Sequence, residues 1–309
     1  MLYEYAVDPK TMGASWENFR YLIEKFGFDR GRIISCFPES WCREVLNAAR
    51  ASDMKTIQLQ KVVEKLSRAD RYALIQTKRR YLPGLGGWLS NALNQQHENP
   101  FRAIVSSANP NNNDVVLLID ELDDLHPLFS AHVSWTAQRT AEAIAQNLRL
   151  LLIASKDIVI IDPFIDLRNR GADYTGPLRQ MFSVMTSAGC TGVKIELHFR
   201  THSSRPPIAL VERDARRWLD GVIPKGCVVE LYEWQDDRRL HDRAVVTERG
   251  GIGSGEGFGV LAEEACLNFS LLATGDSDER MRRHRPANNL LTLAQPVVRV
   301  HSDGTVKRI

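Results

Sequence analysis

A short, continuously apolar run, Ile158–Ile161, places the strongest constraint on how this chain can fold. It follows residues 135–155, which are expected to form one long amphipathic helix. A run without polar alternation is typical of a β-strand buried on both faces, as in a sheet covered by helices. The run ends at Asp162-Pro163-Phe164. Asp162 either serves a site at the carboxyl end of this strand or caps the following turn, and we favour the cap.

Helical and strand-like segments continue to alternate after this run. A helix is expected over about residues 176–188, a strand over 193–200, a further helix over 212–222 and a strand over 227–234. This order predicts an α/β fold in which helices flank a mixed β-sheet. We expect this domain to span residues 126–309 and to follow a mainly helical N-terminal region, residues 1–125.

The N-terminal region is read as helical because apolar residues recur at helical spacing over most of residues 1–80. Ser15 is placed to cap the first helix, and Pro38 opens a second. The asparagine-rich stretch 109–113 is the best candidate for a loop at a domain edge. Asp120-Glu121 after an apolar run imitates a Walker B strand, but no phosphate loop with its lysine precedes it. We therefore predict a buried strand with an acidic turn, and no ATPase.

Composition excludes several classes of protein. The apolar fraction of 43% and the charged fraction of 25% are those of a soluble globular chain, and the net charge of +2 does not by itself indicate nucleic acid. The five widely spaced cysteines include no Cys-x-x-Cys, which argues against a disulfide framework and a zinc ribbon. We expect no metal and no cofactor. The first ten residues lack an apolar signal segment and no run is long enough to cross a bilayer, so a cytoplasmic, prokaryotic protein is expected.

The residues best suited to bind or react with a ligand are concentrated in the stretch from Leu240 to Gly259. It contains His241 and Arg243, a strand-like run at residues 244–247, Glu248, and glycines at every other position from 251 to 259. Cationic side chains beside a glycine-rich loop suit a phosphate site, to which we assign Arg243 and the loop residues Gly253, Ser254 and Gly255. A hairpin with a solvated, charged flank is the alternative.

Two further groups of cations are candidates for the same ligand. His198 and Arg200 stand at the end of an expected strand and are assigned to phosphate binding, unless they only begin an exposed loop. The most basic local run supplies a candidate nucleic-acid patch, although such a run is often a solvated loop. Its arginines are Arg280, Arg282, Arg283 and Arg285.

The His241, Arg243 and Glu248 pattern with its glycine-rich turn resembles the phospholipase D superfamily. The signature of that family is His-x-Lys-x-x-x-x-Asp followed by a Gly/Ser-rich turn, so arginine and glutamate here replace lysine and aspartate. The sequence motif is most similar to that of the phospholipase D-like domain at the C-terminus of microtubule-interacting-and-trafficking (MIT) domain proteins and of its bacterial relatives. The resemblance covers roughly residues 130–309 and implies a degenerate motif on a phospholipase D-like fold.

The resemblance also implies a chemistry and a context. In active members a histidine attacks phosphorus, a second copy of the motif supplies an acid, and no metal is needed. His241 and Glu248 would then be catalytic. A homodimer, or His198, would provide the second histidine. Because arginine cannot replace lysine in geometry, the changes favour binding over turnover.

We therefore expect binding of a phosphodiester backbone, DNA in preference to RNA, within a protein complex of a prokaryotic anti-phage defence system. The alternatives are a metal-independent homodimeric nuclease or phosphodiesterase and a non-catalytic module for acidic lipid or for a protein partner. A membrane ranks below nucleic acid because the chain has no obvious basic amphipathic anchor.

Overall fold

The computed structural model describes residues 1–202, 207–235, 240–261, 265–288 and 290–309. The chain forms two compact units, Leu2–Val133 and Ser134–Ile309. The boundary expected after residue 125 falls inside the first of these. No helix among the described residues is both long and apolar enough to cross a membrane.

The first unit is built on a sheet of five parallel strands in the order β3-β2-β1-β4-β5. The strands are β1 Tyr3–Val7, β2 Arg32–Ser35, β3 Leu74–Ile75, β4 Ile104–Ser106 and β5 Val116–Leu118. Because all five run the same way, the segments that follow them meet at one edge of the sheet.

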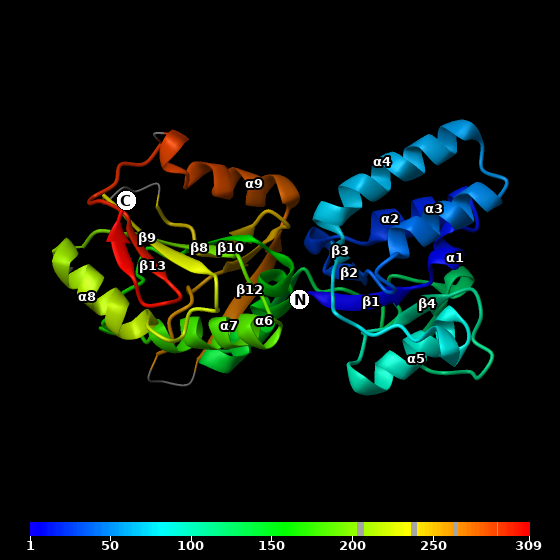
Figure 1. Cartoon of the computed structure of the whole chain (residues 1–309), viewed down its shortest axis with the longest axis horizontal. Helices are drawn as coiled ribbons and strands as arrows, with labels where there is room; N and C mark the ends of the chain where they lie inside the picture. The colour runs from blue at the N-terminus through cyan, green and yellow to red at the C-terminus, as the bar shows by residue number, and fades with distance from the viewer. Residues whose placement is uncertain (203–206, 236–239, 262–264, 289) are drawn as a thin grey trace. The chain divides into compact units, whose positions relative to one another are not determined.

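Helices cover both faces of this sheet (Figure 1). Helices α2, α3 and α4 pack on one face around a core that includes Phe19, Trp41 and Val62. Helix α5 packs on the other face with Phe37 and Phe101. The elements are α1 Pro9–Gly13, α2 Trp16–Lys25, α3 Trp41–Ala51, α4 Thr56–Tyr72, α5 Trp88–Glu98, and the 3₁₀ turns η1 Phe28–Arg30, η2 Pro83–Leu85 and η3 Ile119–Glu121.

The expected helices of the N-terminal region are present, but the parallel sheet beneath them was not predicted. Ser15 caps α2 as expected, since its hydroxyl accepts a hydrogen bond from the Asn18 amide at 3.1 Å. Strands β2 and β3 are only four and two residues long. Apolar runs this short cannot be told from buried helix by periodicity, so a mainly helical region is corrected to an α/β unit.

The second unit contains a sheet of nine strands in the order β14-β13-β9-β8-β7-β10-β11-β12-β6. Strands β7, β8 and β9 are parallel, and the remaining neighbours are antiparallel. The strands are β6 Ser134–Gln138, β7 Asp157–Ile161, β8 Lys194–Arg200, β9 Val228–Trp234, β10 Ala244–Thr247, β11 Gly251–Ser254, β12 Cys266–Leu272, β13 Val298–His301 and β14 Val306–Arg308.

Helices α6, α7 and α8 lie on one face of this sheet and α9 lies on the other (Figure 1). Their bounds are α6 Ala141–Ala154, α7 Thr175–Ser187, α8 Ile208–Leu219 and α9 Thr274–Arg283, with the 3₁₀ turn η4 Pro286–Asn288 after α9. The α/β class expected from the sequence is confirmed, and the apolar run Ile158–Ile161 forms β7, whose residues there are almost fully buried.

One predicted helix is in fact a strand followed by a shorter helix. Residues 135–155 were expected to form a single helix, but β6 occupies the beginning and α6 starts only after Thr140. Trp135 stacks on Phe269 of the neighbouring β12 with 5.6 Å between ring centroids, which holds the edge strand in place. The Thr140 hydroxyl accepts a hydrogen bond from the Ala143 amide and begins the helix.

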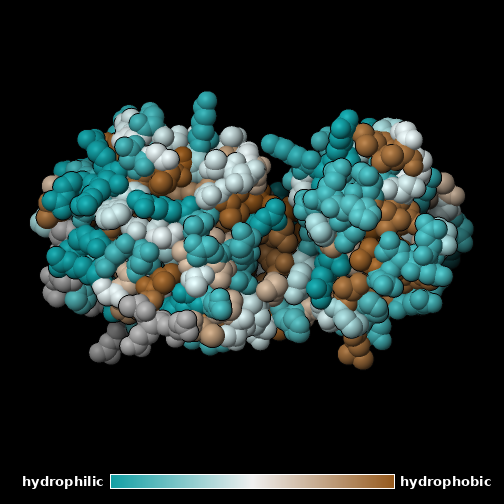
Figure 2. All heavy atoms as spheres, turned by 90° about the horizontal axis from the view of Figure 1, so that it is seen from below, coloured by the Kyte–Doolittle hydropathy of each residue, from teal (hydrophilic) through white to brown (hydrophobic). Residues whose placement is uncertain are grey.

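Each unit shows a mainly hydrophilic surface on the face seen in Figure 2, with hydrophobic residues in smaller patches. Such scattered patches are normal for a globular protein and do not by themselves indicate an interface.

Candidate functional site

The chain reaches β10 at the edge of the sheet where β7 and β8 end. Strand β10 runs antiparallel to β7, with Ala244 opposite Ile161, while β8 runs parallel to β7. The residues that follow β7 and β8 therefore lie at the same edge as those that precede β10. This topology brings together Asp162, Arg200 and Arg243, which are far apart in the sequence.

An exposed aromatic ring contacts two arginines at this edge. The Phe164 side chain is 47% exposed. The guanidinium carbon of Arg200 lies 5.1 Å from the centroid of this ring, and that of Arg243 lies 5.2 Å from it. The two guanidinium groups are thus no more than about 10 Å apart, so an anion midway between them would lie about 5 Å from each, within the Debye length of about 8 Å at physiological salt. We call Phe164, Arg200 and Arg243 the arginine–phenylalanine site.

Arg243 is held by the glycine loop. Its Nη1 donates a hydrogen bond of 2.7 Å to the carbonyl oxygen of Gly255, and its buried Nε has no hydrogen-bond partner among the described residues. Gly257 has a φ of +84°, and a Cβ there would lie 2.3 Å from Asp162 Oδ2 and 3.2 Å from Arg243 Cδ. Only glycine permits this close approach of the backbone to both side chains.

Asp162 ties this loop to β7. It is fully buried, and its Oδ1 accepts a hydrogen bond of 3.0 Å from the Phe164 amide, which confirms the predicted cap. Its Oδ2 accepts a second one, also 3.0 Å, from the amide of Phe258. Burial raises the pKa of the Asp162 carboxyl, while these two hydrogen bonds and the charge of Arg243 oppose that rise. The carboxyl group positions the loop instead of facing a ligand.

The glycine loop itself does not form a cradle of amide groups for phosphate. The Ser254 and Gly255 amides donate to the carbonyl oxygens of Arg243 and Asn268, and the Ser254 hydroxyl donates to Gly257. Gly253 lies within β11. The phosphate-binding role expected for Gly253, Ser254 and Gly255 is therefore corrected: these residues support Arg243, because their polar groups are used within the fold.

Arg139 was not predicted and reinforces the same loop. It follows β6 at this edge, and its guanidinium donates hydrogen bonds to the carbonyl oxygens of Gly259 and Glu256, at 2.7 and 3.1 Å. No local signal distinguishes it from other arginines, since its position depends on the pairing of β6 with β12.

His241 lies directly before this site and is exposed. The described residues give it no hydrogen-bond or ion-pair partner. The next residue, Asp242, pairs with Arg280 at 3.3 Å and with Arg283 at 3.4 Å, both on α9. The two neighbours therefore differ: Asp242 anchors α9, and His241 is presented to solvent.

Glu248 lies at the opposite end of β10 from His241. Its carboxylate accepts hydrogen bonds from the amides of Lys156 at 2.8 Å and Asp157 at 3.0 Å, where β7 begins. The whole of β10, four residues and roughly 13 Å long, lies between Glu248 and His241, together with Asp242 and Arg243. The catalytic role assigned to Glu248 is therefore corrected to a structural one, because the carboxylate cannot reach a ligand at the arginine–phenylalanine site.

His198 does not face the site. It is fully buried, its Nδ1 accepts a hydrogen bond of 3.0 Å from the Trp234 indole, and its Nε2 lies 3.0 Å from Glu196 Oε2. Burial lowers the pKa of His198, which keeps the ring neutral. The expected role in phosphate binding, or as a second catalytic histidine, is corrected because both ring nitrogens are already bonded in the core.

The basic run forms α9 and the turn after it, and its charges are matched by carboxylates. Arg280 and Arg283 share Asp242, as described above. Arg282 contacts Glu279 at 2.7 Å, and Arg285 contacts Glu196 and Asp157. The nucleic-acid patch expected at Arg280, Arg282, Arg283 and Arg285 is therefore largely neutralised within the fold, since each guanidinium already has an acidic partner.

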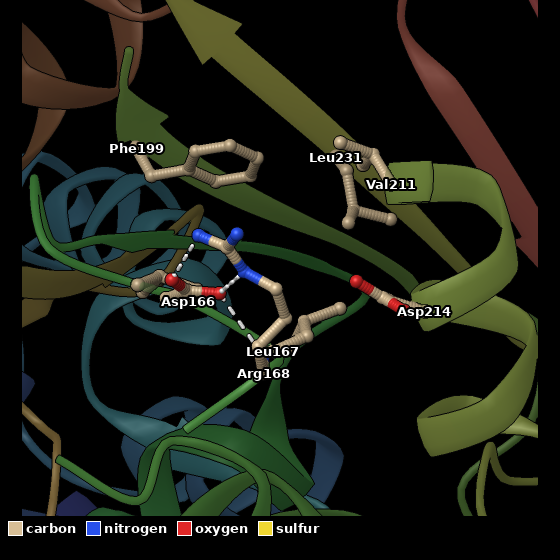
Figure 3. A pocket seen from close by; sticks show the side chains of 8 residues that line it. Asp166, Leu167, Arg168, Phe199, Val211, Asp214 and Leu231 are labelled. Atoms are coloured by element: carbon tan, nitrogen blue, oxygen red, sulfur yellow. Dashed lines mark hydrogen bonds and ion pairs between the residues drawn. The ribbon is translucent and has the colours of Figure 1, made fainter. Parts of the chain in front are cut away.

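A small pocket is lined partly by residues adjacent in the sequence to Phe164 and Arg200 (Figure 3). It is lined by Arg168, Asp214 and apolar side chains, including Phe199, and has a volume of about 20 Å³. Asp166 holds Arg168 through both carboxylate oxygens. A space of this size accommodates about one water molecule, so the pocket is too small to bind a nucleotide or a lipid headgroup.

The part of the chain that the structure describes contains no evident metal-binding site. No group of three or more His, Cys, Asp or Glu side chains there is positioned to hold a metal ion.

No protein-family model and no curated protein matches the chain. Two of the solved structures that overlap with it illustrate the low similarity. Nuc from Salmonella typhimurium, a phospholipase D family member, is 6% identical with a TM-score of 0.32 over 52% of this chain and 97% of that chain. TrmBL2, an archaeal chromatin protein with a novel mode of DNA binding, is 9% identical with a TM-score of 0.28 over 53% and 55%. Both TM-scores lie below 0.5, so neither match carries an assignment for this chain.

Proposed function

We propose that the second unit binds the phosphodiester backbone of nucleic acid at the arginine–phenylalanine site. The observation that carries this proposal is the pair of guanidinium groups about 5 Å from one exposed phenyl ring. A guanidinium matches a phosphate in charge and in hydrogen-bond geometry. An exposed aromatic ring beside it offers a face on which a base can stack. Single-stranded DNA is the first ligand to test.

The arrangement favours binding over hydrolysis. Of the two histidines assigned to the site, His241 is exposed and His198 is enclosed in the core, while Glu248 is bonded at the far end of β10. Turnover through a phosphohistidine would need a second histidine from another copy of the chain as a homodimer. A metal-independent nuclease is accordingly the alternative.

The finer parts of the proposal rest on the sequence resemblance. They are a phospholipase D-like fold close to the domain of MIT proteins, a cytoplasmic location, and a place beside other proteins in an anti-phage defence complex. Acidic lipid is a competing anionic ligand for the same arginines.

Binding is tested by fluorescence anisotropy with labelled single-stranded and double-stranded DNA from about 50 to about 200 mM salt. We expect Arg243→Gln and Arg200→Gln each to lower the affinity about tenfold at low salt and to reduce the salt dependence by about one charge. Phe164→Ala should weaken single-stranded binding more than double-stranded binding, because only unpaired bases are free to stack.

Arg216→Gln is the matched control, because Arg216 is an exposed arginine on α8, away from the sheet edge. No binding at low salt, or equal loss in the Arg216 variant, would contradict the proposal. Plasmid cleavage in EDTA that disappears in His241→Ala would establish the nuclease alternative. Flotation with anionic vesicles, in place of DNA binding, would establish the lipid alternative.

A further inference from the structure

A wide pocket in the first unit has no part in the site described above. Its volume is about 820 Å³, within the range of pockets that hold small ligands. It is lined by two short segments, Pro38–Arg43 and Arg79–Tyr81. The first segment follows β2 and the second follows β3.

The pocket lies at the carboxyl edge of the sheet. Strands β2 and β3 are parallel, so both lining segments leave the sheet at its carboxyl edge. The strand order β3-β2-β1-β4-β5 is that of an open, doubly wound sheet, with helices on both faces. Such sheets bind ligands outside the carboxyl ends of their strands, at the point where the strand order reverses. Here that point lies between β1 and β4, and the pocket lies next to it, outside β2 and β3.

The lining carries two arginines without carboxylate partners. Arg79 forms a buried, bidentate ion pair with Glu4, in which its Nε and Nη2 donate to the two carboxylate oxygens at 2.8 and 2.7 Å. Arg43 and Arg80 are exposed, and among the described residues neither has an ion pair or a hydrogen bond from its side chain. Glu39 is the one acidic side chain of the lining, so the unmatched charge of the pocket is positive.

Packing and hydrogen bonds to buried residues hold both lining segments in place. Phe37 packs against Tyr81 with 5.4 Å between ring centroids, and its carbonyl oxygen accepts a hydrogen bond of 2.8 Å from the Trp88 indole. Arg79 also donates to the carbonyl oxygen of Asn99 and lies over the ring of Phe101. The neighbouring Arg80 is therefore presented on an anchored segment, which lowers the entropic cost of binding.

Further donors line the same space. Helix α3 begins at Trp41, and the amides of Cys42 and Arg43 in its first turn have no acceptor among the described residues. The Ser40 hydroxyl donates to Glu44 at 2.6 Å and does not cap the helix. These amides and the helix dipole favour an anion close to Arg43.

We propose that this pocket binds a phosphate monoester, with Arg43 and Arg80 as its anion-binding residues. The group belongs either to a free nucleotide or to the 5′ end of a nucleic acid. The proposal concerns the first unit alone and does not depend on the function proposed for the second.

The test uses the full chain carrying Arg243→Gln, so that binding by the second unit is reduced. The probes are inorganic phosphate, AMP, adenosine, and one short oligonucleotide with either a 5′ phosphate or a 5′ hydroxyl, measured by calorimetry at low salt. We expect binding of AMP or of the 5′-phosphorylated oligonucleotide and at least tenfold weaker binding of the matching unphosphorylated probe. Arg43→Gln and Arg80→Gln should each lower the affinity about tenfold, and Arg50→Gln, an exposed arginine at the end of α3, should not.

A second readout follows the Cys42 thiol, which lines the pocket. A hydrogen bond with Cys36 lowers the pKa of the Cys42 thiol, which favours its alkylation. The bound phosphate should slow alkylation at Cys42 but not at Cys190 or Cys266, as mapped by mass spectrometry. Preference for AMP would identify a free nucleotide, and preference for the 5′-phosphorylated oligonucleotide would identify a nucleic-acid end. The proposal is overturned if phosphorylated and unphosphorylated probes bind alike, or if the Arg43 and Arg80 variants bind as the Arg50 variant does.

Discussion

Substitution of Glu248 by alanine should separate stability from ligand binding in this protein. The carboxylate accepts two hydrogen bonds, from the amides of Lys156 and Asp157. These bonds link the start of β7 to the end of β10. Alanine removes both bonds and leaves two amide groups without their acceptor. Because the ligand site lies at the other end of β10, we expect a less stable protein that binds DNA with unchanged affinity.

The size of the effect follows from the geometry. A single hydrogen bond to a charged group contributes about 1.5–3 kcal/mol, and we assign that range to the two Glu248 bonds together because water competes for the carboxylate. The Glu248 side chain is 30% exposed, so water replaces part of the interaction and the lower half of that range applies, about 2 kcal/mol. For a unit of this size, 1 kcal/mol shifts Tm by roughly 2–4 °C, so the expected loss is about 4–8 °C.

Differential scanning calorimetry and DNA anisotropy measure the two effects on one sample. Glu248→Gln keeps one acceptor and should show a smaller loss of Tm than Glu248→Ala. Arg243→Gln should give the opposite pattern, with much weaker binding and a smaller loss of Tm, because only its one hydrogen bond to Gly255 is lost from the fold. If Glu248→Ala abolishes DNA binding while Tm stays the same, Glu248 contacts the ligand and the structural role argued here is wrong.

Three further predictions follow from the same sheet edge and from α9. Gly257→Ala should lower stability by about 2 kcal/mol or more and weaken DNA binding, because its Cβ would collide with Asp162; Gly255→Ala, where the nearest atom is 4.0 Å away, is the control for both measurements. Asp242→Asn should tighten DNA binding at low salt and steepen its salt dependence, since it removes the carboxylate shared by Arg280 and Arg283 and leaves only Glu279 beside Arg283; unchanged anisotropy would refute this. Burial lowers the pKa of His284 to about 3, so only the unfolded chain gains this proton as the pH falls below 6.5, and stability should fall by up to about 1.4 kcal/mol per pH unit; calorimetry from pH 7 to pH 5 should show a shallower fall in His284→Gln.

Local signals in the sequence determined the elements around the candidate site. The unbroken apolar run Ile158–Ile161 predicted a strand buried on both faces, and it is β7. Asp162 was expected to cap the turn after it, and its carboxylate does so. These predictions succeeded because each depends on interactions between residues a few positions apart, which the order of side chains alone specifies.

The tertiary structure alone decided which side chains meet. Arg200 and Arg243 reach Phe164 only because β8 is parallel and β10 antiparallel to β7, a pairing of segments distant in the sequence. His198 looked available at a strand end, yet its ring is fully buried and packs against His284 at the end of α9, with 5.3 Å between ring centroids. Strand alternation tells which residues share a face, but whether that face meets water or a helix depends on long-range packing that no local pattern records.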